Sequence, residues 1–193
     1  MRQYIILISL LFCSQYLLAQ SQKQVENWLY NLPIERSPVA IRKAILKNNN
    51  FEDDRKEQLK DFRNENSTYR GTILQPLLPK SGNIDSAKIY LRIGQLNMQD
   101  GYSGDMKWLH FEYFSSDTLF LNTLFDSACT QLKETSIEQK FTGHRTKNNE
   151  AVGKGLSFIY ISNSIKYRSI SATRVRYTSG KQSLSIIYSG SDE

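Results

Sequence analysis

The chain has 193 residues, with 25 Lys and Arg against 19 Asp and Glu, a net charge of +6 and two cysteines. This length suits one domain with a buried core. Two cysteines exclude a zinc site built from several cysteines and a disulfide-rich scaffold. The modest positive charge indicates a general attraction to anions and says little about fold.

The first 19 residues predict an export signal. Arg2 supplies a positive start, residues 4–12 are apolar apart from one serine, and Ala19 is a small residue suited to cleavage. An uncleaved anchor is an alternative, but the apolar run is short for a membrane span. We therefore expect cleavage after Ala19 and a secreted or periplasmic mature chain with no membrane span.

Lipidation at Cys13 is a second alternative, which Phe12 disfavours because a small residue normally stands there. Removing Arg2 with the signal leaves 24 Lys and Arg against 19 Asp and Glu, a charge of +5. Cys129 is then the only thiol, so an internal disulfide is impossible. We expect Cys129 to be a small buried apolar residue on the stripe of the 118–133 helix; a catalytic thiol is disfavoured near a helix C-terminus.

Residues 20–66 predict an N-terminal helical segment with a charged connector. Apolar residues at helical spacing predict helices over 22–32 and 37–47, the second capped by Ser37 and followed by asparagines. Two helices joined by a proline-containing turn predict a helical hairpin. The dense charge of residues 51–66 fits either a solvated helix or a flexible connector.

Residues 67–193 predict one α+β body. Period-two alternation predicts strands at residues 69–74, 87–98, 106–114, 137–141, 156–162, 165–177 and 183–189. The apolar positions change from odd to even after Gly94, which predicts a bulge or sharp bend at Gly94–Gln95. Residues 142–155 are polar and glycine-rich and predict a long loop.

A single amphipathic helix is predicted over residues 118–133. Leu121, Leu124 and Leu132 fall on one stripe, and residues 115–117 offer an N-cap. An apolar stripe needs a cover, and strands flank it on both sides. The predicted fold class is a two-layer α+β domain, with an antiparallel sheet of about six strands packed on this central helix after the N-terminal helical hairpin.

A basic strand is the strongest binding candidate. Its cations alternate along residues 165–177, so we expect them about 7 Å apart on one sheet face, joined by cations of the preceding loop. The candidate binding residues are Lys166, Arg168, Arg174, Arg176, Arg145 and Lys147. They could hold an unknown protein, an anionic glycan or a lipid surface; the export signal disfavours nucleic acid. The alternative is an ordinary solvated sheet face.

Catalytic signals are weak. His110 and Glu112 share one face of a strand and could act as base and acid, but further metal ligands are missing nearby, and a simple polar patch explains them as well. Gly153-Lys154-Gly155 lacks the Ser/Thr and the following helix of a phosphate-binding loop. No metal site and no cofactor are predicted.

Three functions remain open from the sequence. The first is an exported, non-catalytic binding or protein-interaction domain of the cell envelope or exterior, which engages an anionic partner through the basic face. The second is an exported hydrolase that uses His110 and Glu112 with Asp100 or Asp105. The third is a small-ligand binder with an aromatic pocket between the sheet and the 118–133 helix.

Overall fold

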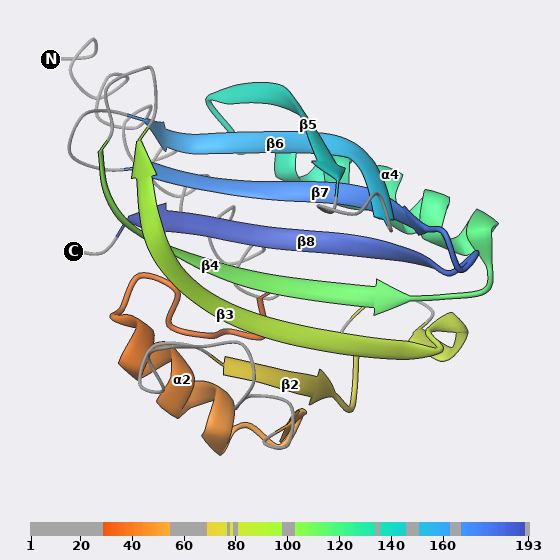
Figure 1. Cartoon of the computed structure of the whole chain (residues 1–193), viewed down its shortest axis with the longest axis horizontal. Coiled ribbons are helices and arrows are strands. Elements are labelled where there is room, and N and C mark those ends of the chain that lie inside the picture. Colours follow the sequence, from red (N-terminus) through yellow and green to blue (C-terminus); the bar gives the residue numbers. More distant parts are fainter. Residues whose placement is uncertain are drawn as a thin grey trace, which may run out of the picture.

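The computed structural model describes residues 29–54, 69–76, 78, 81–97, 103–133, 136–145, 151–162 and 167–191. A single antiparallel sheet of eight strands dominates these residues, in the order β1-β2-β3-β4-β8-β7-β6-β5 (Figure 1). The strands are β1 Phe51–Asp53, β2 Tyr69–Ile73, β3 Ser86–Asn97, β4 Ser103–Phe114, β5 Glu138–Arg145, β6 Ala151–Ser162, β7 Tyr167–Tyr177 and β8 Gln182–Ser191. The helices are α2 Pro38–Lys47, α4 Thr118–Lys133 and the 3₁₀ turn η1 Ser81–Asn83.

The predicted fold class is wrong in the number of strands, in the central place of the helix and in the N-terminal helical hairpin. The described residues form one sheet of eight strands with two α-helices, not about six strands on a central helix after a helical hairpin. The described end of the predicted 22–32 helix is a turn, because Tyr30 and Asn31 have φ values of 59° and 54°. A left-handed backbone cannot continue a right-handed helix. Residues 22–28 lie outside the described residues.

Strand pairing also extends into segments that were predicted as connectors. Phe51–Asp53, the start of the charged segment, forms β1 and pairs with β2; residues 55–66 lie outside the described residues. The predicted loop 142–155 is mostly strand, since β5 continues to Arg145 and β6 begins at Ala151. The glycine–lysine–glycine stretch 153–155 therefore lies within β6 and is not a loop.

The predicted bulge at Gly94–Gln95 is absent. The β3–β4 register runs without interruption through Gly94 opposite Met106 and Gln95 opposite Asp105. Gly94 has another role. A Cβ at this position would stand 3.0 Å from the Trp108 ring, so the absence of a side chain at Gly94 leaves room for that ring. The register shift falls instead in β6, between Ile159 and Ile161.

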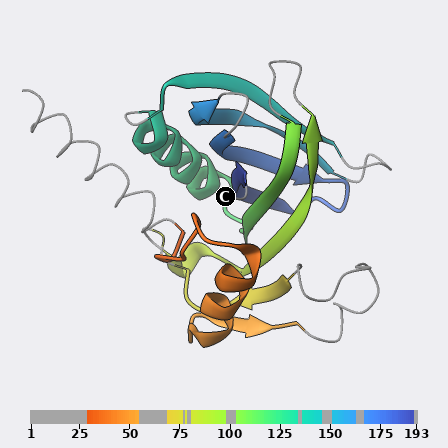
Figure 2. The same ribbon diagram turned by 90° about the vertical axis from the view of Figure 1, so that its left-hand side faces the viewer.

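The predicted central helix is confirmed as α4, with the same bounds. Asp117 caps it, since its Oδ1 accepts the backbone N–H of Phe120 at 2.9 Å. Leu121, Leu124 and Ala128 are buried against β6, β7 and β8. Figure 2 shows α4 on one side of the curved sheet, with α2 lower down beside β1 and β2. The main core is therefore the layer between the sheet and these helices.

The other face of the sheet, turned away from α4, is here called the open face. Alternation along β4 places Leu109, Phe111 and Tyr113 in the main core, so Trp108, His110, Glu112 and Phe114 lie on the open face. A second apolar cluster on this face joins Met106 of β4, Ile159 of β6 and Tyr167 of β7. β8 lies between β4 and β7 in the strand order, so this cluster reaches across β8.

No helix of the described residues is long and apolar enough to cross a membrane. The expected export signal and its cleavage point lie outside the described residues.

Candidate functional site

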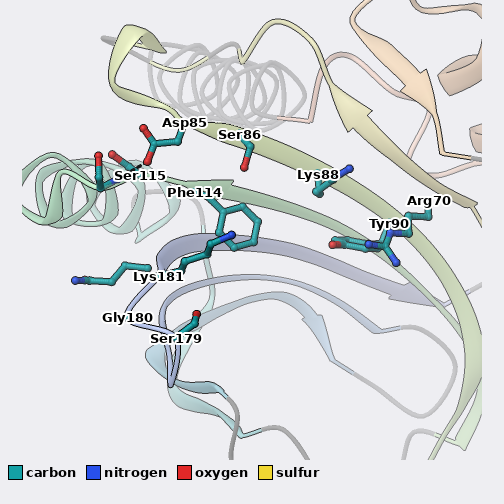
Figure 3. A pocket seen from close by; sticks show the side chains of 12 residues that line it. Arg70, Asp85, Ser86, Lys88, Tyr90, Phe114, Ser115, Ser179, Gly180 and Lys181 are labelled. Atoms are coloured by element: carbon teal, nitrogen blue, oxygen red, sulfur yellow. Dashed lines mark hydrogen bonds between the residues drawn. The ribbon is translucent and has the colours of Figure 1, made fainter. Parts of the chain in front are cut away.

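The open face carries a pocket of about 620 Å³ where β3 begins and β4 ends. Its walls combine cations, hydroxyls and two aromatic rings, as Figure 3 shows for the labelled side chains. The lining residues are Arg70, Asp85, Ser86, Lys88, Tyr90, Phe114, Ser115, Ser116, Ser179, Gly180, Lys181 and Gln182. A concave site with apolar rings and a few polar groups is the usual form of a ligand pocket.

Strand register brings the first two cations together. Arg70 of β2 stands opposite Tyr90 of β3, and its guanidinium carbon lies 5.6 Å from the centre of the Tyr90 ring. Lys88 lies two residues before Tyr90 on the same face. Its Nζ is 2.7 Å from Asp54 Oδ2 and 2.8 Å from Thr72 Oγ1. The Asp54 partner reduces the charge that Lys88 presents to the pocket.

The third cation comes from the turn between β7 and β8. Gly180 has a φ of 84°, which glycine adopts without strain, and hydrogen bonds from Gly180 to Tyr177 and from Tyr177 to Lys181 close the turn. Lys181 is exposed at the rim. The turn falls between the predicted strands 165–177 and 183–189. The turn faces the start of β3 across the pocket (Figure 3).

A buried acidic group lies next to the pocket wall. Glu112 is only 5% exposed, and its Oε1 accepts hydrogen bonds from the hydroxyls of Tyr177 and Ser183. Burial, and then the bond to Glu112, raise the pKa of Tyr177 well above its usual value, so this hydroxyl remains a donor at neutral pH. The Tyr177 ring lies 5.8 Å from that of Phe114. Glu112 therefore anchors the aromatic wall.

His110 and Glu112 lie on the same face, as predicted, which is the open face. Their side chains, however, interact with different residues. His110 Nε2 contacts Ser185 Oγ, and its ring lies 5.1 Å from the Tyr90 ring. The hydrogen bonds of Glu112 go to Tyr177 and Ser183. A nucleophile must be reached by its substrate, and Ser185 is only 4% exposed. The geometry gives the hydrolase hypothesis no accessible nucleophile at this pair.

The predicted basic strand has a different environment from the one expected. Arg168, Arg174 and Arg176 do share a face, but it is the face that α4 covers. Arg168 forms an ion pair with Glu35. Arg174 donates to Asn122 Oδ1 of α4 at 2.8 Å and lies over the Phe125 ring.

Of the remaining four predicted cations, one has a described side chain. Arg176 is exposed at the end of β7. Arg145 belongs to β5, where its side chain is not described, and Lys147 and Lys166 lie outside the described residues. Two of the six predicted cations are therefore engaged by the chain's own N-terminal segment and helix.

Three further predictions concern a thiol, a metal site and an aromatic pocket. Cys129 is half-buried on α4, and burial followed by nearby Asp126 raises its pKa to about 11, which disfavours a thiolate at neutral pH. Within the described ranges, no group of three or more His, Cys, Asp or Glu could hold a metal ion. The expected aromatic pocket between sheet and helix differs from the 620 Å³ pocket, which lies on the opposite face.

Sequence reasoning missed the cations that line the pocket. Arg70, Lys88 and Lys181 each looked like a polar residue on a solvated strand or in a turn. Alternation does indicate that Lys88 and Tyr90 share a face. Their neighbours across the sheet could not be known without the strand order.

No protein-family model, curated protein or solved structure matches this chain. Function is therefore inferred from the residues of the open face.

Proposed function

We propose that this chain is an exported, non-catalytic binding domain that holds an anionic ligand in the open-face pocket. One observation carries the proposal: a pocket of about 620 Å³ combines Arg70, Lys88 and Lys181 with the rings of Tyr90 and Phe114. Among the described lining residues Asp85 is the only carboxylate, and it accepts the backbone N–H of Ser116 at 2.6 Å. Asp54, beside the pocket wall, pairs with Lys88. Arg70 and Lys181 still leave the local charge positive, which favours an anion.

The composition of the walls favours an acidic glycan as this ligand. Sugar rings present a flat C–H face and many hydroxyls, which suit aromatic rings and serine side chains respectively. Ser86, Ser115, Ser116 and Ser179 all line the pocket. A carboxylate or sulfate group of the glycan would be attracted to Lys181 and Arg70.

Charge reversal at the rim tests the proposal. Lys181→Glu should weaken binding of acidic oligosaccharides by about tenfold, because a rim cation becomes a repelling anion. Isothermal titration calorimetry against acidic and neutral oligosaccharides measures this. Binding by the unchanged chain should also weaken as salt is raised.

Lys47→Glu is the matched control, since it makes the same charge change at an exposed residue of α2, away from the pocket. This variant should bind as tightly as the unchanged chain. Equal losses in both variants would indicate only a general charge effect, and no binding by the unchanged chain would refute an acidic-glycan site.

A further inference from the structure

Within the part of the chain that the structure describes, β5 is an edge strand of the sheet. β5 ends the strand order, and among the described strands it pairs only with β6. The opposite edge is β1, which has three residues, whereas β5 has eight. Natural sheets protect their edges with short strands, prolines or bulges, because exposed backbone donors and acceptors pair with other strands. β5 contains no proline, and its pairing with β6 shows no bulge from Glu138 to Arg145.

Two large apolar side chains on or just before this strand are exposed to solvent. Phe141 of β5 is 94% exposed, and Ile137, which immediately precedes β5, is 71% exposed. The backbone of Ile137 also contacts β6, because its N–H donates to Ile159 O at 2.8 Å. By alternation, Phe141 lies on the face of β5 opposite to Glu138 and Lys140. α4 packs against β6, β7 and β8, which leaves this pair uncovered.

The residues between them carry opposite charges. Glu138 and Lys140 share the other face of β5, where Lys140 Nζ lies 3.3 Å from Glu138 Oε1, with both side chains about half exposed. Along residues 137–141 the side chains are in turn apolar, acidic, amide, basic and apolar. Two copies of this segment that run in opposite directions therefore place acidic against basic side chains and apolar against apolar ones.

We propose that β5 binds β5 of a second copy of this chain as an antiparallel strand, with the two-fold axis at Gln139. In this register Glu138 stands directly opposite Lys140 of the second copy, and Ile137, just before the strand, comes close to Phe141, each pair occurring twice. Directly opposite residues of an antiparallel pair lie on the same face, which the observed alternation satisfies. An interface across a two-fold axis must be self-complementary in this way.

Neighbouring registers lose the complementarity. Moving the axis to Phe141 places Lys140 opposite Thr142 and removes both Glu–Lys pairs. Moving it to Ile137 places Glu138 opposite Ser136 and takes Phe141 out of the apolar pair. Only the register centred on Gln139 satisfies both the charged and the apolar pairs.

Complementary charge variants test the register. Glu138→Lys places like charges opposite each other in a homodimer, and so does Lys140→Glu; each should weaken self-association by about tenfold or more. An equal mixture of the two variants should form a heterodimer as strong as the unchanged homodimer, because every opposed pair then has opposite signs. Sedimentation velocity of the whole chain over a concentration series measures both.

Arg176→Glu is the control, because it makes the same charge change as Lys140→Glu at an exposed position of β7; it should leave self-association unchanged. Phe141→Lys should abolish association through the apolar pair, independently of the ion pairs. A chain that stays monomeric at all concentrations would overturn the proposal, and so would a dimer that neither charge variant weakens or a mixture that fails to associate.

Discussion

At the scale of single residues, Gly155 shows how closely the strands approach each other. A Cβ at this position would stand 2.0 Å from the backbone oxygen of Ala172 and 2.6 Å from Thr173 Cα. Backbone atoms cannot move aside as a flexible side chain does, so β6 and β7 must separate to admit any other residue. The sequence pattern around 153–155 indicated a flexible loop; the tertiary structure makes its last glycine a packing residue.

Gly155→Ala should therefore destabilise the fold by about 2 kcal/mol, as overpacking in a close-packed interior usually does. The measurement is the free energy of unfolding from a urea titration followed by circular dichroism. Gly143→Ala on β5 is the matched control, since the nearest atom to its Cβ is 3.8 Å away. Equal stabilities for the two variants would mean that β6 and β7 are less tightly packed than described.

At the scale of elements, α4 depends on both a buried stripe and a cap. Its stripe buries Leu121, Leu124 and Leu132 against the sheet. Its first turn leaves backbone N–H groups without partners inside the helix. Asp117 satisfies one of these, from Phe120, and its Oδ2 accepts a bond from Asn83 Nδ2 at 3.3 Å. The cap thus also ties the helix to η1.

Asp117→Ala should lower the free energy of unfolding by about 1 kcal/mol, the usual cost of losing an N-cap. Thermal and urea unfolding experiments both measure this loss of stability. Asp126→Ala removes the same side chain from an exposed position in the middle of α4 and should change stability by only a few tenths of a kcal/mol. A fully stable Asp117→Ala variant would contradict the role of the cap.

At the scale of the whole molecule, burial of tyrosine hydroxyls links stability to high pH. The pKa values of Tyr69, Tyr90, Tyr113 and Tyr177 are all raised above 10, mainly by burial. The unfolded chain loses these protons near pH 10, whereas the folded chain retains them. Their contribution is therefore complete below pH 10 and is lost as pH rises through the folded pKa values.

The free energy of unfolding should fall progressively above pH 10. Urea titrations at a series of pH values measure the fall, and ultraviolet absorbance of the tyrosinate follows the proton loss. The folded chain should ionise these four tyrosines only as it unfolds, while exposed tyrosines titrate normally. Simple titration of all tyrosines near pH 10 in the folded chain would contradict their burial.

Local patterns in the sequence determined most of the elements, because alternation and helical spacing are properties of neighbouring residues. They placed α4 with its bounds and found most strands of the sheet. They could not find β1, which is too short to show a period, nor the continuation of β6 through Gly153 and Gly155. They also gave residues 29–32 to a helix that Tyr30 and Asn31 interrupt.

Strand order, by contrast, depends on contacts between residues far apart in the chain, and only the tertiary structure decided it. The sequence showed that Arg168 and Arg174 share a face, but not that α4 and Glu35 occupy that face. The sequence also did not show that Lys88 of β3 and Lys181 of the β7–β8 turn line the same pocket. The open-face pocket exists because β8 inserts between β4 and β7, a pairing that no local pattern specifies.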